Sequence, residues 1–82
     1  MKRFQRSRVA VAFGKVLRGH RKAKGLSQEE LAADCEFDRT YPSLLERGLR
    51  TPTLTVLFSI ANNLDVGADQ LVDQTQEELK RL

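Results

Sequence analysis

The stretch that decides the fold of this chain is residues 25–48, which read GLSQEELAADCEFDRTYPSLLERG. Ser27 and Glu30 stand three positions apart within it, which is the spacing of a capping box. In a capping box, each of the two side chains accepts a hydrogen bond from a free backbone amide at the start of a helix. The sequence therefore predicts a helix that starts at Ser27.

A second helix is predicted from about Arg39 to Arg47. Asp38 is a candidate N-cap for this helix, and Gly48 is a residue type that commonly ends helices. Only residues 34–37 remain between the two helices. Two short helices that are joined so tightly and cross steeply form a helix-turn-helix, whose second helix lies in the major groove of DNA.

Apolar residues at helical spacing predict three further helices outside this pair. One runs from Ser7 to Gly25, one begins at Pro52 or Thr53, and a last helical turn or two begins at Gly67. The inward stripe of the fourth helix is expected to comprise Leu54, Leu57, Phe58, Ala61 and Leu64. The fold class is therefore all-α, a compact five-helix bundle in one domain of 82 residues.

Within this bundle we distinguish three parts of the chain. Residues 1–7 are expected to be a basic arm, residues 8–74 the helix-turn-helix domain, and residues 75–82 a C-terminal helical extension. Val56 and Ile60 lie on the shoulder of the fourth helix. Candidates for a dimer seam are Val56, Ile60, Val66 and Leu71; the alternative is the edge of the core for Val56 and Ile60, and a place in the core for Val66 and Leu71.

Charge is distributed unevenly along the chain. The formal net charge is only +3, yet residues 1–25 contain nine Lys or Arg and no Asp or Glu, whereas all eleven carboxylates come later. This asymmetry favours a face or arm that meets a polyanion, and an acidic end at residues 65–78 that a polyanion repels. The alternative interpretation is a basic helix exposed to solvent.

Cys35 and His20 are the only cysteine and the only histidine. They cannot form an intramolecular disulfide or a Cys/His metal site, and they offer no nucleophile and base pair for catalysis. We therefore expect no enzyme activity, no cofactor and no metal. No apolar run approaches the length of a membrane span, so a soluble protein in the reducing cytoplasm, associated with the nucleoid, is expected.

The sequence resembles the phage repressor and Cro type of helix-turn-helix domain over about residues 16–72. The resemblance is carried by GLSQEELA, by ERG at residues 46–48, and by Leu17, Arg21, Pro52, Leu54, Leu57, Ile60, Ala61, Leu64 and Val66. It implies a five-helix, lambda-repressor-like fold and a homodimer on a palindromic operator. Residues 38–43 are, more narrowly, similar to the controller proteins of restriction-modification systems, which regulate their own promoter and that of the endonuclease.

The resemblance also implies roles for particular residues. The implied DNA-binding residues are Gln28, Arg39, Thr40, Tyr41, Ser43, Leu44, Arg50 and Thr51. Among them Gln28 braces a phosphate or a neighbouring side chain, and Arg39 is the main candidate for base readout, because a guanidinium can contact guanine with two hydrogen bonds. Arg21 and Glu46 are implied to form an ion pair that ties the first helix to the end of the third.

Three residues depart from the family pattern. Glu36 stands where the turn usually has a glycine, so either a non-glycine residue holds a positive φ there or the turn differs. Pro42, as the fourth residue of the predicted helix, removes the first helical hydrogen bond, to the Asp38 carbonyl. Asp65 replaces a common helix-ending glycine, and aspartate tolerates the left-handed conformation moderately well.

The predicted function is a sequence-specific regulator of transcription, a repressor or autoregulator that binds double-stranded DNA as a homodimer. The alternative is an antitoxin or another protein-interaction module with the same fold. In that alternative, the shoulder formed by Val56 and Ile60 and the acidic C-terminal end bind a partner protein.

Overall fold

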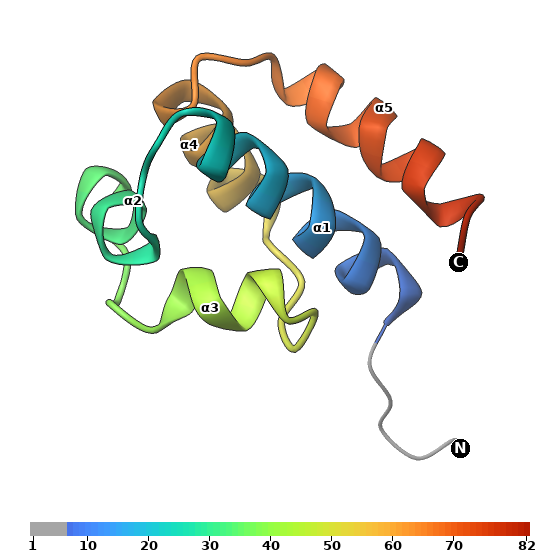
Figure 1. The fold of residues 1–82 in the computed structure, drawn as a ribbon, viewed down its shortest axis with the longest axis horizontal. Helices are drawn as coiled ribbons and strands as arrows, with labels where there is room; N and C mark the ends of the chain where they lie inside the picture. Colours follow the sequence, from blue (N-terminus) through green and yellow to red (C-terminus); the bar gives the residue numbers. More distant parts are fainter. Residues whose placement is uncertain (1–6) are drawn as a thin grey trace.

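The computed structural model describes residues 7–82, and this part of the chain forms helices without strands. The helices are α1 (Arg8–Ala23), α2 (Gln28–Cys35), α3 (Tyr41–Glu46), α4 (Leu54–Asn63) and α5 (Ala68–Leu79). In Figure 1, α1 lies between α3 below and α5 above, α2 closes the left side, and α4 contacts both α2 and α5. The predicted all-α, five-helix fold is confirmed. The predicted basic arm, apart from Ser7, lies outside the described residues.

Three of the helices start where a local side chain caps them. The Ser7 hydroxyl accepts hydrogen bonds from the first amides of α1. At α2, Ser27 Oγ accepts from the Glu30 amide at 3.0 Å and Glu30 Oε1 accepts from the Ser27 amide at 2.8 Å, so the predicted capping box is confirmed. Thr53 caps α4 in the same way as Ser7 caps α1.

Four of the helices end in a common backbone turn. After α1, α2, α3 and α4 the chain passes through one residue of positive φ, namely Gly25, Glu36, Gly48 and Asp65 in turn. At Glu36, φ is 59°, and the following Phe37 amide donates to the Ala32 carbonyl at 2.8 Å, which is the bond of a Schellman motif. The turn between α2 and α3 is therefore the usual left-handed one, held by a glutamate in place of glycine.

The third helix begins later than predicted, at Tyr41 instead of Arg39. Asp38 still organises the start, because its carboxylate accepts from the Thr40 amide at 3.1 Å and from the Thr40 hydroxyl at 2.5 Å. Its carbonyl accepts from the Tyr41 amide at 3.0 Å. Pro42 is consequently in the first turn of α3, where a missing amide hydrogen leaves no helical bond unmade. The predicted loss of a hydrogen bond to Asp38 does not arise.

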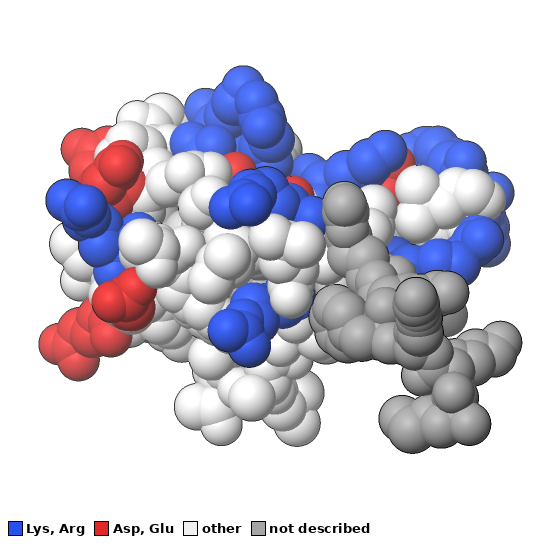
Figure 2. Space-filling view, turned by 90° about the horizontal axis from the view of Figure 1, so that it is seen from below, with Lys and Arg blue, Asp and Glu red and all other residues white. Residues whose placement is uncertain are grey.

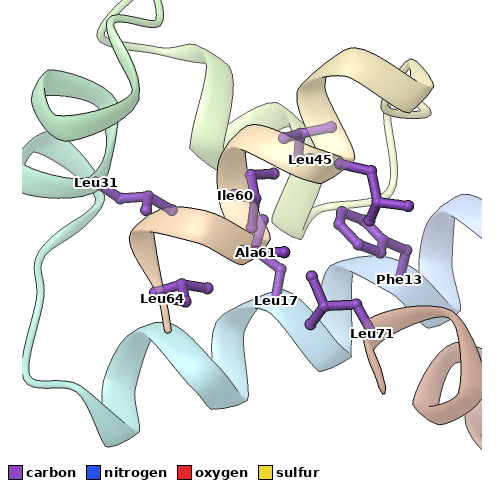
Figure 3. Close-up of a cluster of buried hydrophobic side chains, with 9 residues drawn as sticks. Phe13, Leu17, Leu31, Leu45, Ile60, Ala61, Leu64 and Leu71 are labelled. Atoms are coloured by element: carbon purple, nitrogen blue, oxygen red, sulfur yellow. The ribbon is translucent and has the colours of Figure 1, made fainter. Parts of the chain in front are cut away.

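The core draws side chains from all five helices (Figure 3). It comprises Phe13, Leu17, Leu31, Leu45, Leu57, Ile60, Ala61, Leu64 and Leu71. Burial of a Leu, Ile or Phe side chain contributes about 1.5–3 kcal/mol to stability. Helices as short as α2 and α3 are not stable in isolation, so this shared core is what holds them in place.

The fourth helix turns a different face to the core than predicted. Leu54 and Phe58, which the apolar stripe places inside, are 68% and 57% exposed, whereas Ile60, placed on the shoulder, is 0% exposed. The buried face instead combines Ile60 with Leu57, Ala61 and Leu64. The physical reason is that α4 packs against both α2 and α5, and these two neighbours select its inward face.

The fifth helix continues to Leu79, so the short helix predicted from Gly67 and most of the helical extension predicted at residues 75–82 form one continuous helix. The boundary that we predict between residues 74 and 75 lies within this helix. Polar contacts join α1 to α5 and to the residues after it: His20 Nε2 lies 2.6 Å from Gln74 Oε1 of α5, and Arg8 donates to the carbonyl of Leu82, beyond the helix, at 2.9 Å. Among residues 7–82 no helix is long and apolar enough to cross a membrane.

Candidate nucleic-acid interface

A shallow depression of about 340 Å³ lies where α2 and α3 meet. Its lining residues are Gln28, Glu29, Arg39, Thr40, Ser43, Leu44 and Arg47. Five of these belong to the predicted DNA-binding set: Gln28, Arg39, Thr40, Ser43 and Leu44. The structure thus brings most of that set together on one surface, which we call the α2–α3 depression.

The predicted ion pair between Arg21 and Glu46 is present. Arg21 Nε and Nη2 donate to the two Glu46 carboxylate oxygens at 2.6 and 3.0 Å, and the side chains are only 9% and 2% exposed. The third guanidinium nitrogen donates to the Leu26 carbonyl at 2.7 Å. The hydrogen bond to Glu46 raises the pKa of Arg21, and burial acts in the opposite direction. This pair joins α1 to the end of α3 and to the loop before α2.

Gln28 extends the ion pair to the edge of the depression. Its Nε2 donates to Glu46 Oε1 at 3.0 Å, so the Glu46 carboxylate receives hydrogen bonds from both Arg21 and Gln28. Because an amide nitrogen carries two hydrogens, one N–H of Gln28 remains for another acceptor. Gln28 therefore braces a neighbouring side chain, as predicted, and still has a donor for a phosphate.

The backbones of α1 and α3 approach each other closely at Gly14. A Cβ atom at this position would lie 2.6 Å from the carbonyl oxygens of Leu45 and Glu46. Gly19, the other glycine of α1, has no such neighbour within 4 Å. The C-terminal end of α3 is thus seated directly on α1, and this contact fixes where the rest of α3 points.

The N-terminal end of α3 carries the exposed polar residues. Arg39 is exposed, and beside it the Asp38 carboxylate accepts the two Thr40 hydrogen bonds. These hydrogen bonds, followed by the charge of Arg39, hold the pKa of Asp38 below its usual value. The hydrogen of the Thr40 hydroxyl is used by Asp38, so toward a ligand Thr40 presents its methyl group and the lone pairs of its oxygen.

Three predicted DNA-binding residues lie outside the depression. Tyr41 is half-buried and packs edge-to-face on Phe37, with ring centroids 5.2 Å apart. Arg50 and Thr51 lie in the loop after α3, where Arg50 is exposed and Thr51 lines an apolar groove near α5. Of the eight predicted DNA-binding residues, five therefore line the depression, while Tyr41 of α3 and the two loop residues lie outside it.

Sequence reasoning missed two residues that line the depression, Glu29 and Arg47. Arg47 could have been found, since residues 40, 43, 44 and 47 follow the i, i+3, i+4, i+7 spacing of one helix face. Glu29 had no comparable signal, because a carboxylate is not expected on a surface for a polyanion.

Figure 2 views the protein from the side on which Figure 1 shows α3. Lys and Arg side chains are spread across this face, whereas most of the visible Asp and Glu surface lies at the left edge. The described part of the chain contains no group of three or more His, Cys, Asp or Glu that could hold a metal ion.

Comparisons with known proteins identify the family of this chain. A model of the helix-turn-helix family matches residues 17–71. An uncharacterized HTH-type transcriptional regulator of Sinorhizobium fredii is 46% identical over 57 residues, which are 70% of this chain and 74% of the relative.

Two solved structures of restriction-modification controller proteins are also similar. One is C.AhdI from Aeromonas hydrophila, with a TM-score of 0.73 and 44% identity over 76% of this chain and 94% of the other. The second is the C.Esp1396I tetramer in complex with its natural 35 base-pair operator, with a TM-score of 0.78 and 32% identity over 89% of this chain and 96% of the other. The predicted likeness to repressors of the Cro type and to controller proteins is thus confirmed, and the chain belongs to the helix-turn-helix family.

Proposed function

We propose that this protein is a sequence-specific, double-stranded DNA-binding regulator of transcription, which represses or autoregulates as a homodimer on a palindromic operator. The observation that carries the proposal is the α2–α3 depression, where Gln28, Arg39, Thr40, Ser43 and Leu44 share one surface. The operator complex of the C.Esp1396I tetramer supports it. Such a protein acts on chromosomal DNA in the cytoplasm, and its relatives are regulators, so we assign it no catalytic role.

In this proposal α3 lies in the major groove and Arg39 reads a base. A guanidinium can donate two hydrogen bonds to guanine O6 and N7, and such a contact discriminates by about 1–3 kcal/mol. Thr40 presents its methyl group to the same groove, where thymine carries a methyl. The remaining N–H of Gln28 faces the phosphate backbone that the first helix of the motif crosses.

Binding to two DNA duplexes tests the proposal. One duplex is the DNA that flanks the protein's own gene, and the second has the same composition in scrambled order. We expect tighter binding to the flanking DNA, and Arg39→Ala should lower that affinity by about 5- to 150-fold while changing scrambled binding little. Arg81→Ala removes the same charge from the C-terminal residues after α5 and serves as the control. Equal affinity of the wild-type protein for both duplexes refutes specific readout.

The homodimer needs a surface, and two of the four predicted dimer-seam residues lie in the core of the described chain. Ile60 and Leu71 are 0% exposed, so they belong to the core and cannot contact a partner, while Val56 and Val66 are partly buried against that core. The exposed apolar residues of α4 and α5 are instead Leu54, Phe58 and Val72. They line one groove between these helices.

We infer that a second copy of the chain covers this α4–α5 face. Contiguous exposed apolar surface commonly marks an interface, and the similar C.Esp1396I is a tetramer on its operator. Phe58→Asp should convert a dimer into a monomer in size-exclusion chromatography with light scattering. Leu49→Asp, at an exposed leucine in the loop after α3, should leave the dimer intact. A wild-type protein that is monomeric at all concentrations contradicts this assignment.

The same face also favours the alternative function, a protein-interaction module such as an antitoxin. In that case the wild-type protein purifies with a second protein at fixed stoichiometry. Phe58→Asp then removes this partner, and the protein shows no preference between the flanking and the scrambled duplex.

A further inference from the structure

Glu29 is a carboxylate on the surface proposed to meet DNA. It is the second residue of α2, it is exposed, and it lines the α2–α3 depression together with Arg39 and Arg47. Within residues 7–82 its carboxylate forms no hydrogen bond and no ion pair, although its charge reaches Arg21. A carboxylate that can accept hydrogen bonds thus lies among the residues that are proposed to read the bases.

Three of the neighbouring acidic residues have structural partners. Glu30 closes the capping box of α2, Asp38 accepts hydrogen bonds from Thr40, and Glu46 is buried against Arg21. Glu29 lacks such a partner, and its only general contribution to the fold is a favourable charge at the start of a helix. The structure therefore leaves this carboxylate available to a ligand.

Near DNA, an unpaired carboxylate has two opposite effects. It repels phosphates, which lowers affinity about threefold for unit charges about 6 Å apart in water. It also accepts hydrogen bonds from the amino group of a base, most directly from cytosine N4 in the major groove. The first effect acts on every sequence, whereas the second acts only where a base amine stands opposite the carboxylate.

We propose that Glu29 is a specificity-determining residue that accepts a hydrogen bond from a base amine of the operator. This inference rests on the proposed function. On the operator, the hydrogen bond to the amine outweighs the repulsion from phosphates. On other sequences only the repulsion remains, so Glu29 raises affinity for the operator and lowers affinity for other DNA.

The test compares Glu29→Gln with Asp34→Asn on two duplexes. Both variants remove one negative charge from α2, and Asp34 is exposed on another side of that helix. The duplexes are one selected by the wild-type protein from a randomised pool and a scrambled version of it. Fluorescence anisotropy at one salt concentration gives the six affinities of the wild-type protein and the two variants, and thermal unfolding of each variant verifies that it is folded.

We expect Glu29→Gln to weaken binding to the selected duplex at least fivefold and to strengthen binding to the scrambled duplex about threefold. Exchanging single base pairs of the selected duplex should identify one position at which the variant no longer discriminates. If Glu29→Gln raises affinity equally on both duplexes, the Glu29 carboxylate only repels phosphate. If Glu29→Gln changes both affinities as Asp34→Asn does, the position of Glu29 on α2 has no special role. Either result overturns the inference, whereas a wild-type protein without preference between the duplexes overturns the proposed function itself.

Discussion

Replacing Gly14 by alanine is expected to destabilise the protein, while the same replacement at Gly19 is expected to stabilise it. The two glycines lie in the same helix, α1, and alanine favours a helix over glycine by up to about 1 kcal/mol at either site. They differ only in what a new methyl group meets. At Gly14 it meets the carbonyl oxygens of Leu45 and Glu46 at 2.6 Å, and at Gly19 it meets nothing within 4 Å.

The magnitude follows from this difference. Carbon and oxygen atoms at 2.6 Å overlap strongly, and both oxygens belong to the backbone, so α1 and α3 must separate to relieve the contact. Overpacking of this kind costs about 1–3 kcal/mol. We expect the upper end of that range, reduced by the helix preference of alanine, which gives a net loss of about 2 kcal/mol at Gly14 and a gain of about 1 kcal/mol at Gly19.

Thermal unfolding followed by circular dichroism measures both changes. In a domain of this size each kcal/mol shifts Tm by about 4–8 °C, so Gly14→Ala should lower Tm by about 10 °C and Gly19→Ala should raise it by about 5 °C. Gly14→Ala should also weaken binding to the operator, because it displaces the end of α3. Equal Tm values for the two variants refute the close packing of α1 on α3.

Three further predictions concern stability. Glu36→Gly should stabilise the protein by about 0.5–1 kcal/mol in urea unfolding, because glycine adopts the φ of 59° without strain; no change would mean that the turn relaxes. Arg21→Met alone should cost about 3–5 kcal/mol, because it leaves the buried Glu46 charge uncompensated, and adding Glu46→Gln should restore part of the loss; a double variant less stable than the single one contradicts this. Burial raises the pKa of the Cys35 thiol, so the native state holds its proton more tightly than the unfolded chain does. Its contribution to stability is therefore complete below the unfolded pKa of about 8.5 and is lost as the pH rises above it. Cys35→Ala should abolish that decline between pH 8 and pH 10, and an unchanged decline assigns it to other groups.

The helix boundaries could be predicted wherever both partners of a cap are close in sequence. Ser27 and Glu30 satisfy each other within four residues, so their pattern alone locates the start of α2. Gly25 and Gly48 mark helix ends for the same reason, since their positive φ is a local preference. The start of α3 was harder, because Asp38 binds Thr40 in a turn before the helix proper instead of capping it.

The inward face of α4 could not be predicted, because its sequence is apolar on more than one side. Leu54, Leu57 and Phe58 on one stripe compete with Leu57, Ile60 and Ala61 on another, and both have helical spacing. Packing against α2 and α5 selects the second stripe. The predicted dimer seam was wrong at Ile60 for this reason, since a residue on the shoulder of one stripe is at the centre of the other.

In the candidate site, the family resemblance supplied the residue types, and the fold supplied their arrangement. Arg39, Thr40 and Leu44 were expected together, and the structure places them in one depression. The sequence did not identify Glu46 as the acceptor of the Gln28 hydrogen bond, because this contact depends on how α2 meets the end of α3. Nor could the sequence show that Glu29 lacks a partner, since this depends on every neighbour in space.

The contacts that hold α3 are separate from those proposed to touch DNA. Its backbone rests on Gly14 through the carbonyls of residues 45 and 46, and the Glu46 side chain is tied to Arg21. Both anchors are at the C-terminal end of α3, whereas Arg39 precedes its N-terminal end. Arg39→Ala should therefore change the free energy of unfolding by no more than about 0.5 kcal/mol, as an exposed substitution does, while it reduces operator binding. A parallel loss of stability in urea unfolding would show that Arg39 supports the fold, and its effect on DNA binding would then lose its meaning as a test of base readout.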